Sequence, residues 1–137
     1  MRSLFTTFAL PATILATFIA TLSPGIAQSV EPADKAAMQS TMFQHIDRIL
    51  VDGQYTDVNL ANGEIRKLVP QKNHPMVLRM GENFVLCTDF RTQDGEAVNV
   101  DFYAARRGKS FVIFRTEIGN RAPLMQLMNS GKVAMAE

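Results

Sequence analysis

After an apolar N-terminal segment, the hydrophobic residues of this chain follow two successive patterns, a helical one and then a strand-like one. Between residues 33 and 51 apolar side chains recur at steps of three and four, which is the spacing of one helix face. This stripe consists of Met38, Met42, Ile46 and Ile49, with Phe43 and Leu50 beside it. Asp52-Gly53 follows, and glycine is common where a helix ends. We therefore predict a helix over residues 33–51.

After Gly53 the apolar residues alternate with polar ones, which is typical of half-buried strands. We predict strands over residues 55–60, 64–69, 76–80, 83–91, 97–105 and 111–118. Asn62-Gly63 indicates a tight hairpin, and Pro70 is expected to end the second strand before a loop over residues 71–75. A short amphipathic helix over residues 123–128 closes the chain.

This order of elements predicts an α+β fold. One N-terminal helix packs on one face of a five- to six-stranded antiparallel meander sheet, and a short C-terminal helix follows. The expected domains are a signal peptide over residues 1–27 and a single α+β domain over residues 28–137.

Turn lengths fix which side chains share a sheet face. A three-residue turn over residues 93–95 would pair Phe90 with Val98, and it would place Gly95 in the left-handed region. A second three-residue turn over residues 106–108 would pair Val100 with Phe114. In this register the first sheet face is apolar and holds the long helix.

The opposite face of the sheet is mixed, with an apolar end and a polar end. Its apolar end is predicted to contain Val85, Tyr103, Phe111 and Ile113. Two covers are possible: the closing helix, through Leu124, Leu127 and Met128, or a ligand or partner, because apolar patches rimmed by polar groups mark binding surfaces. The candidate binding residues are Cys87, Asp89, Asp101, Tyr103, Arg106, Arg107, Phe111, Arg115 and Glu117.

The first 27 residues have the order of a secretory leader. Arg2 is followed by an apolar run over residues 4–22, and Pro24-Gly25 then leads to small residues. We expect cleavage and export to the periplasm or the exterior, with no stable membrane span afterwards. An uncleaved anchor is the alternative.

The net charge and the cysteine content limit the kinds of partner and the covalent cross-links that this chain can have. Removing Arg2 from the 14 basic residues leaves 13, against 13 acidic ones. This balance argues against nucleic acid as the main partner. Cys87 is the sole cysteine, so no internal disulfide can form, and its apolar surroundings in the sequence favour burial.

Two kinds of chemistry remain as alternatives. Asp89 and Asp101 lie on adjacent predicted strands, and close carboxylates can perform acid–base catalysis. Met76, Met80, Cys87 and His74 fall on one side of a predicted hairpin, and such soft ligands suit Cu(I).

Neither pattern forms a recognisable motif, so we predict no cofactor and no metal site. The function we expect is that of a small exported, non-catalytic binding or accessory protein of the cell envelope. Its partner would be an envelope protein or a small amphipathic ligand. A periplasmic copper-binding protein and a paired-carboxylate enzyme are the alternatives.

Overall fold

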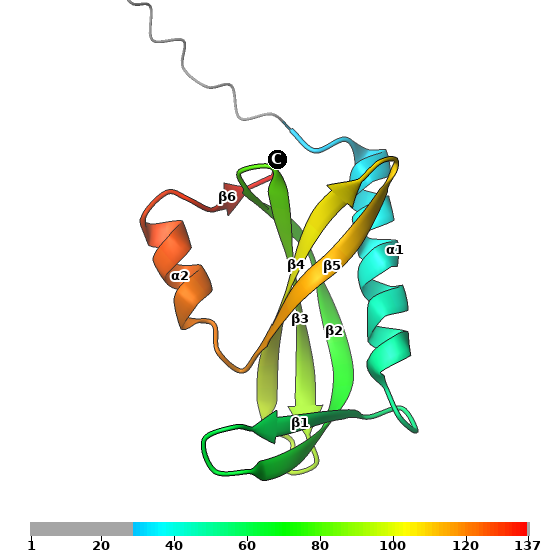
Figure 1. Ribbon diagram of the computed structural model, residues 1–137, viewed down its shortest axis with the longest axis vertical. Helices are drawn as coiled ribbons and strands as arrows, with labels where there is room; N and C mark the ends of the chain where they lie inside the picture. Colours follow the sequence, from blue (N-terminus) through cyan, green and yellow to red (C-terminus); the bar gives the residue numbers. More distant parts are fainter. Residues whose placement is uncertain (1–28, 137) are drawn as a thin grey trace, which may run out of the picture.

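The computed structural model describes residues 29–136, and the predicted leader over residues 1–27 lies outside this range. Helix α1 (Pro32–Ile49) begins the fold and packs against the sheet (Figure 1). The strands are β1 (Tyr55–Asn59), β2 (Glu64–Met80), β3 (Asn83–Thr92), β4 (Ala97–Arg107), β5 (Ser110–Ile118) and β6 (Ala134–Met135). Helix α2 (Ala122–Asn129) lies between β5 and β6. The predicted α+β architecture is therefore confirmed.

The sheet is antiparallel with the order β1-β2-β3-β4-β5, and β6 pairs with β2. Strand β2 runs through Pro70, where we expected a strand to end, and includes the predicted loop over residues 71–75. Its pairing with β3 shifts register between Pro70 and Asn73 and again between Asn73 and Val77. Proline cannot donate a ladder hydrogen bond, so the interruption takes the form of bulges instead of a break.

The turn between β3 and β4 has the predicted register. Phe90 faces Val98 and Leu86 faces Phe102. The N–H of Thr92 donates to the carbonyl of Glu96 over 2.9 Å, and Gly95 has a φ of 89°. This left-handed residue closes the three-residue turn at little steric cost.

The predicted register between β4 and β5 is wrong. Arg107 pairs with Ser110 across a two-residue turn, and Ala104 faces Ile113. A register shift follows, so that Tyr103 faces Arg115 and Phe114 is the additional residue of a β-bulge. Such bulges redirect a side chain.

The bulge changes which residues share a face. Phe111 and Ile113, which we expected on the mixed face, belong to the core beneath α1. Phe114, which we expected in that core, is instead 52% exposed, and its ring centroid lies 6.4 Å from that of Tyr103.

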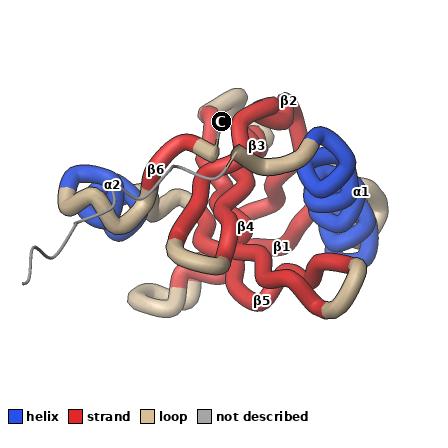
Figure 2. The backbone as a smooth tube through the Cα atoms, turned by 90° about the horizontal axis from the view of Figure 1, so that it is seen from above, coloured by secondary structure: helices blue, strands red, loops and turns tan. Residues whose placement is uncertain are grey.

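The main core lies between α1 and the first sheet face. Met38, Met42 and Ile46 of the predicted helix stripe are buried there. They pack with residues from four strands: Leu68, Val77, Phe84, Leu86, Phe90, Val98, Val100, Phe102, Ala104 and Phe111. Figure 2 shows α1 and α2 on opposite sides of the sheet.

Candidate functional site

Helix α2 covers the apolar part of the second sheet face. Val85, Cys87 and Tyr103 are buried in a second cluster with Leu124, and Leu127 and Met128 pack against it. The remaining buried members are Leu78 and Val133. The closing helix is thus the cover of this part of the face, as one of our two alternatives predicted.

The centre of this face contains a buried carboxylate. Asp101 is 1% exposed and lies opposite Cys87. Arg121, which directly precedes α2, donates from Nη2 to Oδ1 of Asp101 over 2.6 Å and from Nε to Oδ2 over 3.4 Å. Arg121 was absent from our candidate residues because its partner lies 20 positions away.

Cys87 is held as a neutral thiol. Burial, followed by its hydrogen bond with Asp101, raises the pKa of Cys87 to about 12. A thiolate is the form that binds soft metals and acts as a nucleophile. Within residues 29–136, no group of three or more His, Cys, Asp and Glu side chains is arranged to hold a metal ion.

Asp89 has its own partners. Oδ2 of Asp89 lies 2.9 Å from Nε2 of His74, and Oδ1 accepts from Nδ2 of Asn99 over 2.6 Å. Burial acts to raise the pKa of Asp89, but the hydrogen bonds from His74 and Asn99 outweigh it and lower the pKa. Asp89 and Asp101 therefore have separate hydrogen-bond partners, an arrangement that differs from a catalytic pair sharing one proton.

The strip of this face along β5 is more open. Arg115 and Glu117 form an ion pair there, with 63% and 17% of their side chains exposed. Phe114 adds a half-exposed ring beside Tyr103. The last two candidates, Arg106 and Arg107, lie at the far end of β4, and Arg107 is exposed.

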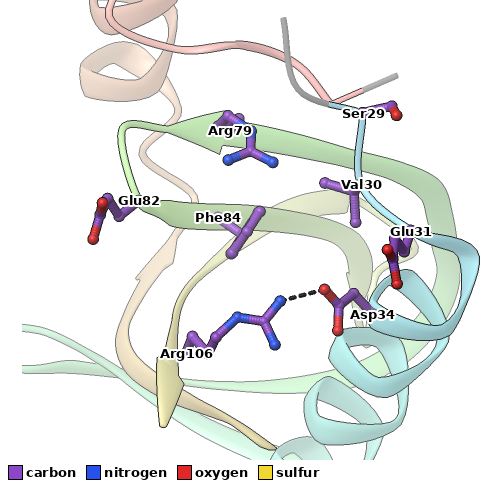
Figure 3. A pocket seen from close by; sticks show the side chains of 8 residues that line it. All are labelled: Ser29, Val30, Glu31, Asp34, Arg79, Glu82, Phe84 and Arg106. Atoms are coloured by element: carbon purple, nitrogen blue, oxygen red, sulfur yellow. Dashed lines mark hydrogen bonds and ion pairs between the residues drawn. The ribbon is translucent and has the colours of Figure 1, made fainter. Parts of the chain in front are cut away.

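Arg106 belongs to a different feature, a pocket at the start of α1. This pocket, called the α1 pocket below, has a volume of about 580 Å³. It lies between the start of α1, the turn from β2 to β3 and the end of β4 (Figure 3). Its lining residues are Ser29, Val30, Glu31, Asp34, Arg79, Glu82, Phe84 and Arg106.

Aromatic rings and guanidinium groups are combined at this pocket. Phe84 and Phe111 meet edge to face with centroids 5.8 Å apart. The guanidinium carbon of Arg79 lies 5.2 Å from the Phe84 centroid, and that of Arg106 lies 4.7 Å from the Phe111 centroid. Cation–π contacts of this kind hold an arginine over a ring.

Arg106 also forms an ion pair with Asp34 of α1. In Figure 3 the two arginines lie on either side of Phe84, and Glu82 points away from that ring. The pocket therefore combines an apolar floor with two guanidinium groups, the paired carboxylate of Asp34 and the carboxylates of Glu31 and Glu82. Such a site can bind an apolar body and orient a charged head group.

We expected Arg106 in the turn over residues 106–108 and Phe111 on the mixed face, whereas Arg106 lies in β4 and lines the α1 pocket, and Phe111 belongs to the main core. The pocket itself was missed because its lining residues come from three separate parts of the chain. None of the helices within residues 29–136 has the length and hydrophobicity of a membrane span. No protein-family model, no curated protein and no solved structure matches this chain.

Proposed function

We propose that this chain is a small exported, non-catalytic binding protein of the cell envelope, and that it holds a small amphipathic anion in the α1 pocket. The observation that carries the proposal is the combination of Phe84 with the guanidinium groups of Arg79 and Arg106 around one cavity. Ligand sites are commonly concave and apolar, with a few charged groups that fix orientation.

The volume and floor of the pocket suit a ligand with an apolar body. A cavity of about 580 Å³ falls within the range of small-molecule sites. Phe84 is only 5% exposed, so its ring is fixed by the core and only a small part of it reaches the pocket. Val30 adds a second apolar wall. An aromatic or aliphatic group would lose its water-exposed surface here.

The proposed head group is an anion because two guanidinium groups lie beside the apolar floor; the lining also includes the three carboxylates of Glu31, Asp34 and Glu82. Asp34 is neutralised by Arg106, and Glu82 points away from Phe84. Arg79 is the second guanidinium beside the ring, and Glu31 is a further carboxylate of the lining. The positive end of the α1 dipole also lies at this pocket. A carboxylate or sulfonate can accept two parallel hydrogen bonds from a guanidinium, which orients the ligand.

An envelope protein docked on the second sheet face is the other form of this proposal. The geometry favours the pocket because Val85, Cys87 and Tyr103 already contact α2. The neutral thiol of Cys87 does not favour the copper alternative, and the separate partners of Asp89 and Asp101 do not favour the paired-carboxylate alternative.

Two fluorescent probes with the same ring system test the proposal. Anilinonaphthalene sulfonate is anionic, and N-phenylnaphthylamine is its neutral counterpart. We expect the anionic probe to bind more tightly to the native protein. Arg79→Gln and Arg106→Gln should each weaken its binding about tenfold, which corresponds to about 1.4 kcal/mol. Neither substitution should change binding of the neutral probe more than about twofold.

Arg107→Gln is the matched control, because Arg107 is exposed and outside the pocket. It should bind both probes like the wild type. Melting curves of all variants establish that the native fold is retained. Equal affinity for the two probes, or anionic binding that is indifferent to both pocket arginines, would refute the anion site.

A further inference from the structure

Strand β5 ends the sheet at one side. Among the described strands, β5 pairs only with β4. The outer edge of β2 is different, because β1 pairs with its first part and β6 with its last part. Figure 2 shows β5 at the margin of the sheet. An open strand edge is a template for pairing with another strand.

Hydrogen bonding to β4 determines which groups of β5 face outward. The N–H of Gly119 donates to the carbonyl of Asn99 over 2.8 Å. The register is uninterrupted from Arg115 to Ile118, so Arg115 and Glu117 also direct their backbone groups towards β4. The backbone groups of Thr116 and Ile118 consequently point away from β4, towards the open edge.

The charged side chains of β5 are complementary to those of a second, antiparallel copy of the same strand. Arg115 and Glu117 are two residues apart, so they share one face and flank Thr116. In an antiparallel pair centred on Thr116, Arg115 would lie opposite Glu117 of a second copy, and Glu117 would lie opposite its Arg115. Opposite charges in directly facing cross-strand positions stabilise a sheet.

The outward backbone hydrogen-bonding groups of β5 also favour a pair centred on Thr116. Two Thr116 residues facing each other across a two-fold axis would exchange both of their outward N–H and carbonyl groups. Closed two-fold contacts of this kind are the commonest in homo-oligomers.

We propose that the outer edge of β5 binds a second copy of this chain in antiparallel register about Thr116, forming a symmetric dimer. This inference goes beyond the proposed ligand site and does not depend on it. The intrachain ion pair between Arg115 and Glu117 is replaced or shared on pairing. The paired segment of β5 is short, so we expect dimers to form only at high micromolar protein concentration.

Sedimentation equilibrium of the purified protein tests the dimer by charge exchange. The wild type should reach twice the monomer mass as its concentration rises. Arg115→Glu and Glu117→Arg should each weaken self-association at least tenfold, because like charges then face each other. Mixed together, the two single variants should form a heterodimer, since every facing pair becomes opposite in charge. The double exchange R115E/E117R should restore the homodimer.

Lys109→Glu is the matched control, because Lys109 carries the same charge in the β4–β5 turn, outside the paired segment. It should associate like the wild type. Circular dichroism and melting curves establish that each variant is folded. A wild type that stays monomeric at all concentrations overturns the dimer, as does a mixture of the two single variants that shows no heterodimer. Probe binding in the α1 pocket is measured separately, so the two proposals can fail independently.

Discussion

Asp101 and Arg121 are joined by a hydrogen bond of 2.6 Å that fastens the start of α2 to the middle of β4. The Asp101 side chain is 2% exposed, whereas that of Arg121 is 30% exposed. A carboxylate buried to this extent needs a partner, because an unpaired charge in the interior is costly. The same contact places α2 over Cys87 and Tyr103, so one ion pair holds the cover of the second face in place.

Replacing Arg121 should therefore destabilise the fold. In Arg121→Gln the charge of Asp101 loses its guanidinium, and we expect the free energy of unfolding to fall by about 2–3 kcal/mol. Urea denaturation measures this change, and hydrogen exchange over α2 should show faster opening. Arg107→Gln, an exposed arginine, should stay within about 0.5 kcal/mol of the wild type. Equal stability of the two variants would contradict the role of Arg121.

Cys87 should be almost unreactive in the native protein. Its pKa is raised from 9.0 to about 12, so at neutral pH the thiolate fraction is lower by a factor of about 10³ than in the unfolded chain. Burial under α2 lowers access further. A thiol reagent followed by absorbance should modify native Cys87 at least a thousandfold more slowly than the denatured protein. Rapid modification without unfolding would contradict the buried thiol.

The raised pKa also has a consequence for stability. Since the folded state retains the thiol proton that the unfolded state releases above pH 9, the contribution of Cys87 is present below that pH and is lost as the pH rises towards 12. The Cys87→Ala variant should show a smaller loss of stability than the wild type over this alkaline range. Parallel loss in both proteins would contradict the raised pKa.

The helix stripe and the main sheet faces could be predicted because each depends on local periodicity. Met38 and Met42 follow the spacing of a helix, and both are fully buried. The turn at Gly95 could be predicted because only one turn length places Phe90 and Val98 on the same face. In both cases a short stretch of sequence contains the whole signal.

The bulge at Phe114 could not be predicted in this way. In a regular strand, Phe111 and Ile113 lie on one face and Thr116 and Ile118 on the other. The additional residue, Phe114, lets both pairs face α1. The α1 pocket was missed for a different reason. It requires the start of α1, the β2–β3 turn and the end of β4 to meet, and no local pattern encodes that meeting.

The contribution of each methionine to the free energy of unfolding should depend on how deeply its side chain is buried. Met42 is fully buried in the main core, and Met76 is 49% exposed. Met42→Ala should lower the free energy of unfolding by about 2–5 kcal/mol, because it removes buried surface and leaves a cavity. Met76→Ala, the same chemical change at an exposed site, should cost less than about 1 kcal/mol. Urea unfolding of both variants measures the difference, and similar losses would contradict this assignment of the core.

Asp89 should make the protein sensitive to acid. Hydrogen bonds from His74 and Asn99 outweigh burial and lower its folded pKa below the ordinary value of 3.8. The stabilisation is therefore present above that ordinary value and is lost as the pH falls through the lowered one. Because the Asp89 side chain is 29% exposed, the effect should be about 1 kcal/mol.

Unfolding curves for the wild type and Asp89→Asn, measured from about pH 6 to about pH 2, test this expectation. The wild type should be the more stable at the upper end, and the two proteins should converge at the acid end, where the carboxylate of Asp89 has taken up its proton. Asp47→Asn, at an exposed position on α1, should instead parallel the wild type throughout. If the difference between the wild type and Asp89→Asn stays constant with pH, the pKa of Asp89 is not lowered by folding, and the contact with His74 then contributes through packing alone.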